Sequence, residues 1–325
     1  MRIVRHHEFG PPSVLRLEEA DKPTPGPGQV LIRAEAVGVN FAECQRRQGI
    51  PVGGPATLPG SPGGDVAGVV EQLGEGVDQV KVGDRVVTGV AADGYAEYVV
   101  TQADRLFAVP EGIAAGQATS LPIPGQTAYH VIVTAAKLQP GETVLITAAA
   151  GGIGHLLVQM AKALGAGQII AAARGTEKLS FAASLGADVT VDYGEDGWDE
   201  KIRAATGGRG VDVALETVGG DILTKSVNLT APFGRTVVYG AAGGELSAID
   251  VADIFDNRIV MGFSMWGVMG AKPDAMAQGA RELVDMVTSG RVRPVVHAEL
   301  PLKDAAAAHE LMESRSQLGR VVLVP

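Results

Sequence analysis

Residues 144–154 read VLITAAAGGIG. The apolar run that ends at Thr147 is typical of a buried strand, and the glycine-rich turn after it opens a helical segment at residues 153–164. Such a turn cradles phosphate, because the free N–H groups of the helix N-terminus face the anion. The pattern is A-x-G-x-x-G and predicts a dinucleotide-binding loop. The loop residues are Ala150, Gly151, Gly152, Ile153 and Gly154.

The two outer glycines of this loop have separate expected roles. Gly151 lets the backbone approach a pyrophosphate, and Gly154 lets the helix pack closely on the strand. The simpler alternative is a glycine-rich turn without a ligand. The strand before the turn and the helix after it favour nucleotide binding.

The chain downstream of the loop alternates strands with helical segments. Strands are expected at residues 168–173, 189–191, 211–216 and 235–239, with a helix at residues 177–185. Alternation of this kind implies β-α-β units around a parallel sheet. The region is therefore of the α/β class.

Both ends of the chain have a different pattern. Short strands separated by glycine and proline are expected at residues 30–33, 66–73, 86–88 and 95–100, which suggests a compact β barrel or sandwich. Near the other end, helices at residues 274–288 and 303–313 accompany an extended piece at 295–300 and a last strand at 320–324. We expect the last strand to join the N-terminal β region.

Composition narrows the class of protein. With 325 residues, 46% of them hydrophobic, two domains are expected. The net charge of −10 and the lack of a strongly basic stretch argue against nucleic-acid binding. No signal peptide or membrane-spanning run is evident, so a soluble, cytoplasmic protein is expected. Cys44 is the only cysteine, which excludes an internal disulfide and a cysteine-built zinc site.

The second strand of the α/β region indicates which dinucleotide is bound. NAD-specific sites place an acidic residue at the end of this strand, about 20 residues after the loop. Here the strand ends in Ala173, and Arg174 and Lys178 flank that position. Two bases and no acid favour the 2′-phosphate of NADPH through charge-assisted hydrogen bonds. The alternative is that both are solvated surface charges.

Several segments together resemble the medium-chain dehydrogenase/reductase superfamily. They are residues 138–145 leading into the loop, 38–41, 68–70 and 82–86, and the three alanines before Gly151 are similar to zeta-crystallin-like quinone oxidoreductases. The resemblance implies a GroES-like β-barrel domain, residues 1–123 completed by 268–325, and a Rossmann domain with a doubly wound parallel sheet, residues 124–267. It also implies a homodimer or homotetramer.

The same resemblance implies that zinc is absent. Zinc-dependent relatives carry a catalytic cysteine where this chain has Asn40, and a Gly-His-Glu motif where it has Gly63-Gly64-Asp65. Zinc needs several thiolate or imidazole ligands in fixed geometry, which these positions lack. No metal site is expected.

Further cofactor contacts follow from the resemblance, residue by residue. Lys178, Tyr193 and Arg315 match groups around the 2′-phosphate, although Tyr193 is alternatively a packed strand residue and Arg315 a surface helix end. The residues that match positions near the nicotinamide and its ribose are Asn40, Thr127, Gly240, Ala241, Phe263 and Ser264. For Phe263 a core or interface role is an equal alternative.

The substrate region departs from the family. Quinone reductases of this type often carry tyrosines after the asparagine, whereas this chain has Gln45 and Arg46 there, so the expected substrate cleft is lined by Asn40, Gln45, Arg46 and Thr127. A quinone can take its proton from water, whereas an enone or enoyl thioester benefits from a positioned acid. The leading hypothesis is therefore an NADPH-dependent quinone reductase. One alternative is an enone or enoyl-thioester reductase. Another is a nucleotide-binding structural or regulatory protein of the crystallin type.

Overall fold

The computed structural model describes residues 1–245 and 247–325, and these residues form two compact units. Unit 1 comprises Met1–Pro124 and Pro294–Pro325, and unit 2 comprises Gly125–Arg293. The boundary between Pro124 and Gly125 lies one residue after the boundary expected from the sequence. The second differs, because residues 268–293 belong to unit 2 and not to the completed first domain.

Helix α9 (Pro273–Thr288) explains this difference. The Tyr129 hydroxyl in α3 (Gln126–Tyr129) donates a 2.7 Å hydrogen bond to Glu282 of α9. Gly279 lies so close to the rings of Tyr129 and His130 that a Cβ there would overlap them. The long helix is thus packed on the start of unit 2, although it lies after the last strand of its sheet.

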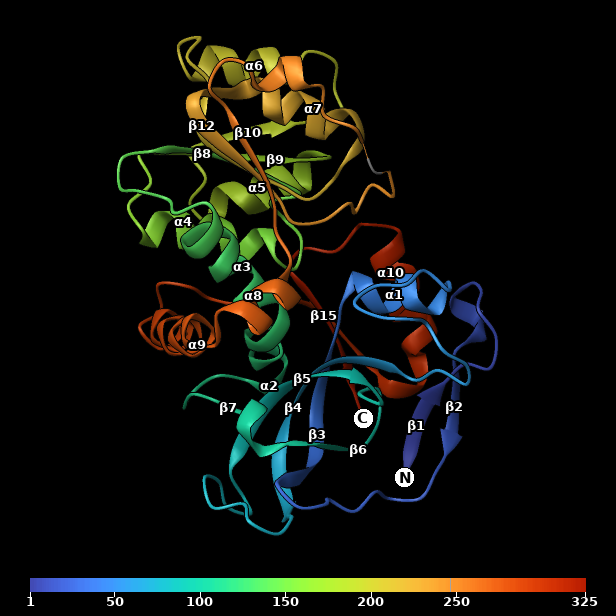
Figure 1. Cartoon of the computed structure of the whole chain (residues 1–325). Helices are drawn as coiled ribbons and strands as arrows, with labels where there is room; N and C mark the ends of the chain where they lie inside the picture. Colours follow the sequence, from blue (N-terminus) through green and yellow to red (C-terminus); the bar gives the residue numbers. More distant parts are fainter. Residues whose placement is uncertain (246) are drawn as a thin grey trace. The chain divides into compact units, whose positions relative to one another are not determined.

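Unit 1 is built on a seven-stranded, largely antiparallel sheet (Figure 1). Its strands run in the order β14-β15-β3-β4-β5-β7, and β6 pairs with β3, while β1 and β2 form a separate pair. The strands are β1 (Arg2–Arg5), β2 (Arg16–Glu19), β3 (Gln29–Val39), β4 (Pro62–Leu73), β5 (Arg85–Ala92), β6 (Tyr98–Gln102), β7 (Phe107–Ala108), β14 (Val296–Pro301) and β15 (Arg320–Val324).

The last strand joins the N-terminal sheet as expected. β15 pairs antiparallel with β3, with Val321 opposite Val39 and Leu323 opposite Val37. Helix α10 (Ala305–Glu313) packs Ala308 and Met312 into the same apolar core. The other helices of the unit are α1 (Phe41–Arg47) and α2 (Ala115–Ala118).

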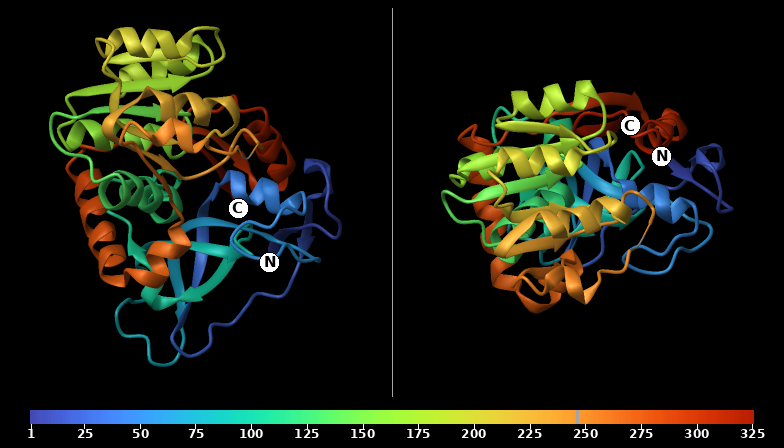
Figure 2. Two further views of the ribbon diagram at one scale, coloured as in Figure 1. Left: turned by 45° about the horizontal axis from the view of Figure 1, so that its top comes forward. Right: turned by 90° about the horizontal axis from the view of Figure 1, so that it is seen from above.

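Unit 2 holds a six-stranded parallel sheet, with helices packed on it (Figure 2). The order β10-β9-β8-β11-β12-β13 is that of a doubly wound Rossmann sheet, in which the strand order reverses between β8 and β11. The strands are β8 (Thr143–Thr147), β9 (Gln168–Ala173), β10 (Val189–Asp192), β11 (Val211–Glu216), β12 (Thr230–Val238) and β13 (Ile259–Gly262). The helices besides α3 and α9 are α4 (Gly154–Ala163), α5 (Thr176–Ser184), α6 (Trp198–Ala205), α7 (Gly220–Leu229) and α8 (Met265–Ala271).

The central strands of this sheet are apolar throughout because both faces are covered. Leu145, Ile170 and Ala214 are fully buried in one core cluster, together with Trp198 of α6. The sequence did not reveal α6 or α7, although it placed the strands around them. No described helix is both long enough and apolar enough to span a membrane.

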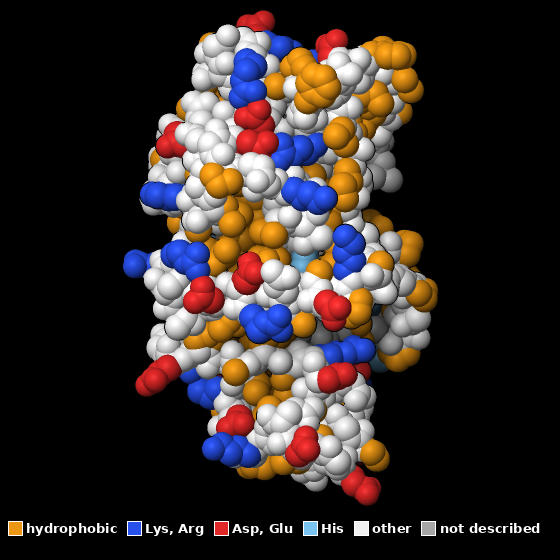
Figure 3. Space-filling model, turned by 60° about the vertical axis from the view of Figure 1, so that its left-hand side comes forward, with side chains coloured by type: hydrophobic (Ala, Val, Ile, Leu, Met, Phe, Trp, Pro, Cys, Tyr) orange, Lys and Arg blue, Asp and Glu red, His pale blue; other side chains and the backbone are white. Residues whose placement is uncertain are grey.

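Charged side chains are mixed in sign on the face of the molecule in Figure 3. Lysines and arginines alternate there with aspartates and glutamates, and hydrophobic side chains lie between them.

Candidate dinucleotide site

The glycine-rich loop joins β8 to α4, as the sequence predicts. Ala148 begins it with a φ of 48°, which is uncommon for a residue other than glycine, and the Gly151 N–H donates to the Ala148 carbonyl at 3.0 Å. A Cβ at Gly154 would overlap the Ala148 carbonyl oxygen, so only glycine permits this approach of helix to strand. At Gly151 a Cβ would meet one atom, the same oxygen at 3.3 Å, which is a tight contact.

These observations show that the loop fits a dinucleotide. Glycine at position 151 keeps the backbone free of a Cβ and leaves room for a pyrophosphate, and α4 presents its N-terminus behind it. The loop also lies at the carboxyl end of β8, where the strand order of the sheet reverses. Ligands of open α/β sheets bind at this point.

A buried carboxylate organises the neighbouring loop. Glu216 ends β11, is completely buried and accepts hydrogen bonds from the N–H groups of Val218 at 2.6 Å and Gly219 at 3.1 Å. The Thr147 hydroxyl, at the end of β8, also donates to it at 3.4 Å. Burial raises the pKa of Glu216, and the hydrogen bonds from Val218 and Gly219 oppose that rise.

The loop after β12 is hydrogen-bonded to the loop after β11, which is the loop that Glu216 holds in place. The N–H groups of Ala242 and Gly243 each donate a 2.7 Å hydrogen bond, to the carbonyls of Thr217 and Val218. A Cβ at Gly240 would overlap the Thr217 hydroxyl. Gly240 is exposed and Ala241 half-buried, so this pair of loops presents a fixed backbone surface at the carboxyl edge of the sheet.

The end of β9 holds the residues predicted to select the cofactor. Arg174 is exposed, and its guanidinium lies 5.9 Å from the centre of the Tyr193 ring. Asp192 accepts hydrogen bonds from the Gly175 N–H at 2.8 Å and the Gly194 N–H at 2.7 Å, which ties the loop after β9 to the end of β10. Lys178 is half-buried in the first turn of α5. Tyr193 also packs against the apolar core of unit 2.

The remaining predicted cofactor residues are divided between the units. Thr127 is buried in α3, Phe263 follows β13 half-buried, and Ser264 precedes α8 and is exposed, all in unit 2. Arg315 belongs to unit 1, where it is exposed with a φ of 55° after α10. Its convergence with Lys178 and Tyr193 stays a prediction.

Asn40 lies at the centre of a buried polar cluster in unit 1. Its side-chain Nδ2 donates to Asp65 at 3.0 Å, and its Oδ1 accepts from Arg320 at 2.5 Å. Arg320 also forms an ion pair with Asp65, and both side chains are almost completely buried. The backbone N–H of Asn40 donates to Glu43 at 2.7 Å.

Burial raises the pKa of both carboxyl groups in this cluster. For Asp65, Arg320 opposes the rise. Burial and the neighbouring Asp65 carboxylate together raise the pKa of Glu43 to about 7, against the opposing effect of hydrogen bonds from Asn40 and the charge of Arg320. Sequence reasoning missed Glu43 and Arg320 as members of a site.

The segment after Asn40 is more constrained than its sequence suggests. Arg46 donates to the carbonyl groups of Val52 at 2.8 Å and Ala91 at 2.7 Å, so its guanidinium ties the following loop to β5. Arg47 is fully buried and paired with Glu313, so its charge is not available at the surface. Gln45 is half-buried.

No group of three or more His, Cys, Asp or Glu side chains suited to a metal ion occurs among residues 1–245 and 247–325. Cys44 is buried, and burial raises the pKa of its thiol well above the usual range. At the position that corresponds to the cysteine of zinc-dependent relatives, the Asn40 amide is bonded to Asp65 and Arg320.

The fold and this site define a dinucleotide-binding oxidoreductase of the medium-chain type. The family model of the alcohol dehydrogenase GroES-like domain matches residues 26–140, and that of the zinc-binding dehydrogenase matches residues 152–285. A 2-haloacrylate reductase from Burkholderia sp. is 36% identical over 100% of this chain and 99% of its own length. The rat quinone oxidoreductase is 33% identical over 100% of this chain and 98% of its own length.

A solved structure gives the same result. The Escherichia coli quinone oxidoreductase in complex with NADPH superposes with a TM-score of 0.92 at 30% identity, covering 100% of both chains. The chain therefore belongs to the zinc-independent quinone oxidoreductase family of medium-chain dehydrogenases/reductases. The expected combination of a GroES-like domain and a Rossmann domain is confirmed.

Proposed function

We propose that this protein reduces a quinone with NADPH and without zinc. The observation that carries the proposal is the phosphate-binding loop at residues 148–154, followed at the end of the next strand by Arg174 in place of an acid. Relatives named quinone oxidoreductases that align over the full chain support the acceptor. The protein would act in the cytoplasm.

The cofactor would be held at several points of unit 2. The loop backbone at Gly151 and Gly152 would receive the pyrophosphate, and Arg174, Lys178 and Tyr193 would surround the 2′-phosphate, with Arg315 added from unit 1. NADPH supplies the hydride when bound. The chain's own contribution is to hold the reacting groups in register and to exclude water.

The acceptor would lie among Asn40, Gln45, Arg46 and Thr127. Asn40 is the member whose orientation is fixed most completely, since both ends of its amide are hydrogen-bonded. Arg46 would act by shaping the loop over the site, because its guanidinium already bonds two carbonyl groups.

A second candidate is reduction of a carbon–carbon double bond conjugated to a carbonyl group. It is favoured by the relative named 2-haloacrylate reductase. In this reaction the hydride and a proton both end on carbon, so a proton donor is needed.

An acceptor panel tests these proposals. The purified protein is mixed with NADPH and with 1,4-benzoquinone, 9,10-phenanthrenequinone, 2-cyclohexenone or 2-chloroacrylate, and loss of absorbance at the reduced nicotinamide band is followed. We expect turnover with the quinones. Turnover of the enone or the chloroacrylate alone would favour the second candidate, and NADPH binding without turnover of any acceptor would favour a regulatory protein.

We also propose that two copies of the chain associate through one edge of unit 2. Strand β13 is the last strand of the parallel sheet, and we define the β13 edge patch as Phe233, Val251, Phe255, Ile259 and Met261. These side chains are between 40% and 79% exposed. An unpaired apolar strand edge is a template for pairing with another chain.

Phe233, within the β13 edge patch, also favours a second copy of the chain as the partner. Phe233 has a φ of 64°, which is uncommon for a bulky residue, and its ring is 76% exposed, so a position that suits glycine carries a large apolar side chain at the surface. A second copy, related by a two-fold axis, would pair with the open strand edge and cover the exposed rings.

The dimer proposal is tested by mass. Light scattering should give twice 33.4 kDa for the natural chain and close to 33.4 kDa for Ile259→Lys. Val82→Lys is the matched control, since Val82 is 60% exposed and Ile259 is 56% exposed. A natural chain that is monomeric, or an Ile259→Lys variant that stays dimeric, contradicts the proposal.

A further inference from the structure

One side chain near the start of unit 1 has both ends of its amide fixed by buried charges. The guanidinium of Arg320 donates to the Asn40 Oδ1, and the Asn40 Nδ2 donates one hydrogen to the carboxylate of Asp65. The second Nδ2 hydrogen has no acceptor among the residues that the structure describes. Asn40 itself is only half-buried, so part of its surface is open to a bound molecule.

The guanidinium is held by more than its ion pair. Arg320 also donates to the Val39 carbonyl at 3.1 Å and to the Thr119 hydroxyl at 3.4 Å. It fills the space over Gly38, where a Cβ would overlap it. The carboxylate is held as well, because the other Asp65 oxygen accepts the Ile123 N–H at 2.8 Å.

This arrangement changes the chemistry of the amide. An amide whose oxygen accepts a hydrogen bond from a cation becomes a stronger donor through its nitrogen, since hydrogen bonds in a chain polarise one another. Low exposure strengthens the effect, because no water screens the charges. The group it suits best is an oxygen on which negative charge develops.

We propose that Asp65 and Arg320 are positioning residues of the reaction, which fix and polarise the Asn40 amide so that its second Nδ2 hydrogen donates to the carbonyl oxygen of the quinone. This inference rests on the proposed function, because hydride addition to a quinone places the negative charge on that oxygen. Asn40 touches the substrate, and the other two residues act through it.

The first test observes the amide directly and needs no turnover. The chain has only three asparagines, Asn40, Asn228 and Asn257, so asparagine labelled with nitrogen-15 gives signals from only three side-chain amides, each with two hydrogens. Asn40→Ala assigns the signal of Asn40. We expect one of its two hydrogens to exchange slowly with solvent, and both to exchange fast in Arg320→Met and Asp65→Asn.

The same spectrum identifies the acceptor of the second hydrogen. We expect a small change on adding oxidised cofactor and a larger shift of that hydrogen on adding 9,10-phenanthrenequinone to the complex. A shift caused by the cofactor alone, which the quinone does not increase, overturns the assignment to the substrate. Exchange that is the same in the natural chain and in Arg320→Met overturns the positioning role.

The second test separates positioning from folding. We expect kcat for quinone reduction to fall about 10-fold to 100-fold in Asn40→Ala and Arg320→Met, with KM for NADPH unchanged in Arg320→Met, and Arg320→Lys to recover part of the loss. Arg47→Lys is the matched control, since Arg47 is an equally buried arginine paired with Glu313 in the same unit. It should lower the melting temperature and leave kcat unchanged.

Failure of the proposed function and failure of this inference give different results. A natural chain that reduces no quinone removes the proposed function, and with it the substrate contact. A natural chain that reduces quinones while Asn40→Ala keeps its full kcat leaves the proposed function standing and overturns this inference.

Discussion

Glu43 should make the stability of unit 1 depend on pH. Its carboxyl group is 5% exposed and lies beside Asp65, and these two causes raise its pKa to about 7 from the ordinary 4.5. The folded state therefore binds the proton of Glu43 more tightly than the unfolded chain. The resulting stabilisation is fully present below pH 4.5 and is lost as the pH rises through about 7.

The magnitude follows from the difference between the two pKa values. At about 1.4 kcal/mol per pH unit, the interval from 4.5 to about 7 corresponds to about 3 kcal/mol. Glu43→Gln keeps an oxygen acceptor for the Asn40 N–H and cannot ionise. We expect it to gain up to about 3 kcal/mol over the natural chain between pH 4.5 and pH 8, or about 6–12 °C in the melting temperature of a unit of this size.

Calorimetry at several pH values measures this difference. Two neighbouring groups, Tyr95 and Cys44, also have raised pKa values, so they stay neutral over the range and do not obscure the result. Glu111→Gln, at an exposed position of the same unit, is the control and should show no trend. A difference between Glu43→Gln and the natural chain that is flat from pH 5 to pH 8, or that favours the natural chain as pH rises, would refute the reasoning.

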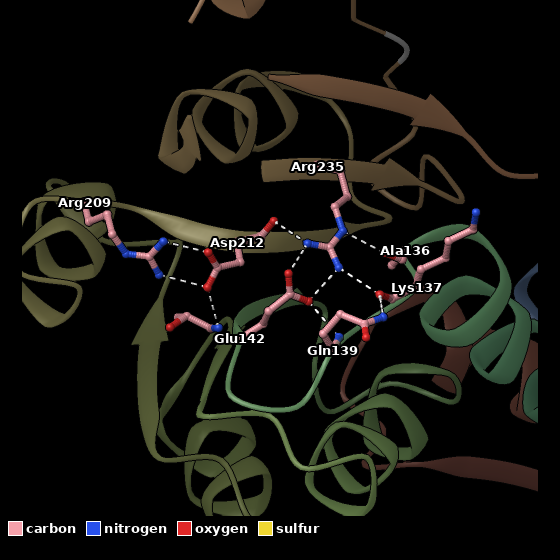
Figure 4. Close-up of polar contacts among 8 residues, drawn as sticks. Ala136, Lys137, Gln139, Glu142, Arg209, Asp212 and Arg235 are labelled. Atoms are coloured by element: carbon pink, nitrogen blue, oxygen red, sulfur yellow. Dashed lines mark hydrogen bonds and ion pairs between the residues drawn. The ribbon is translucent and has the colours of Figure 1, made fainter. Parts of the chain in front are cut away.

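Four further predictions concern unit 2 and the metal. Lys178→Ala should raise KM for NADPH about 10-fold and leave KM for NADH nearly unchanged, since one partly exposed charge-assisted contact is lost; equal losses with both cofactors in steady-state kinetics would contradict it. Glu216→Ala should weaken NADPH binding in fluorescence titration, because the loops after β11 and β12 lose their shared anchor; unchanged affinity would show that they hold without it. Glu142 forms two hydrogen bonds to Arg235, of 2.5 and 2.6 Å (Figure 4), and these bonds help to lower the pKa of Glu142, although burial opposes them. Glu142→Gln should therefore cost about 2 kcal/mol of stability at pH 7, and this loss should disappear as the pH falls through the lowered pKa of Glu142. A loss of stability that persists in acid would count against the pair. Overnight treatment with a chelator should leave activity unchanged, and a loss that zinc restores would contradict the zinc-free assignment.

The strands were predictable because their pattern is local. The bounds expected for β9, β11 and β15 agree with the structure, since each is a short apolar run closed by polar or glycine residues. Helix α6 was missed because only Trp198 and Ile202 of its residues are buried, which leaves a short, mostly polar segment with few apolar residues. The extent of unit 2 was missed for another reason: the packing of α9 on α3 is a contact between distant parts of the chain.

The candidate site was likewise predictable only where its signal is local in the sequence. The phosphate loop and Arg174 follow from spacing after a strand, whereas Asp65, Glu216 and Arg320 were not expected to hold anything. A signal was available, because each is a charged residue within or at the end of a largely apolar strand. Such a charge is buried only when it is hydrogen-bonded or paired, but its partner lies elsewhere in the sequence and only the fold identifies it.

Arg320 shows why the return of the chain to unit 1 matters for more than closing a sheet. The strand β15 pairs with β3 through apolar residues, and that pairing alone would be served by any side chain that fits at its first position. The residue there is a buried arginine, and Gly38 on the facing strand leaves the space for it. Replacing both members of a buried ion pair by apolar residues of similar volume is often neutral or stabilising, so stability alone does not require the pair that Arg320 forms with Asp65. The return strand therefore contributes a charge to Asn40, which is why we expect Arg320→Lys, which keeps that charge, to retain more of kcat than Arg320→Met.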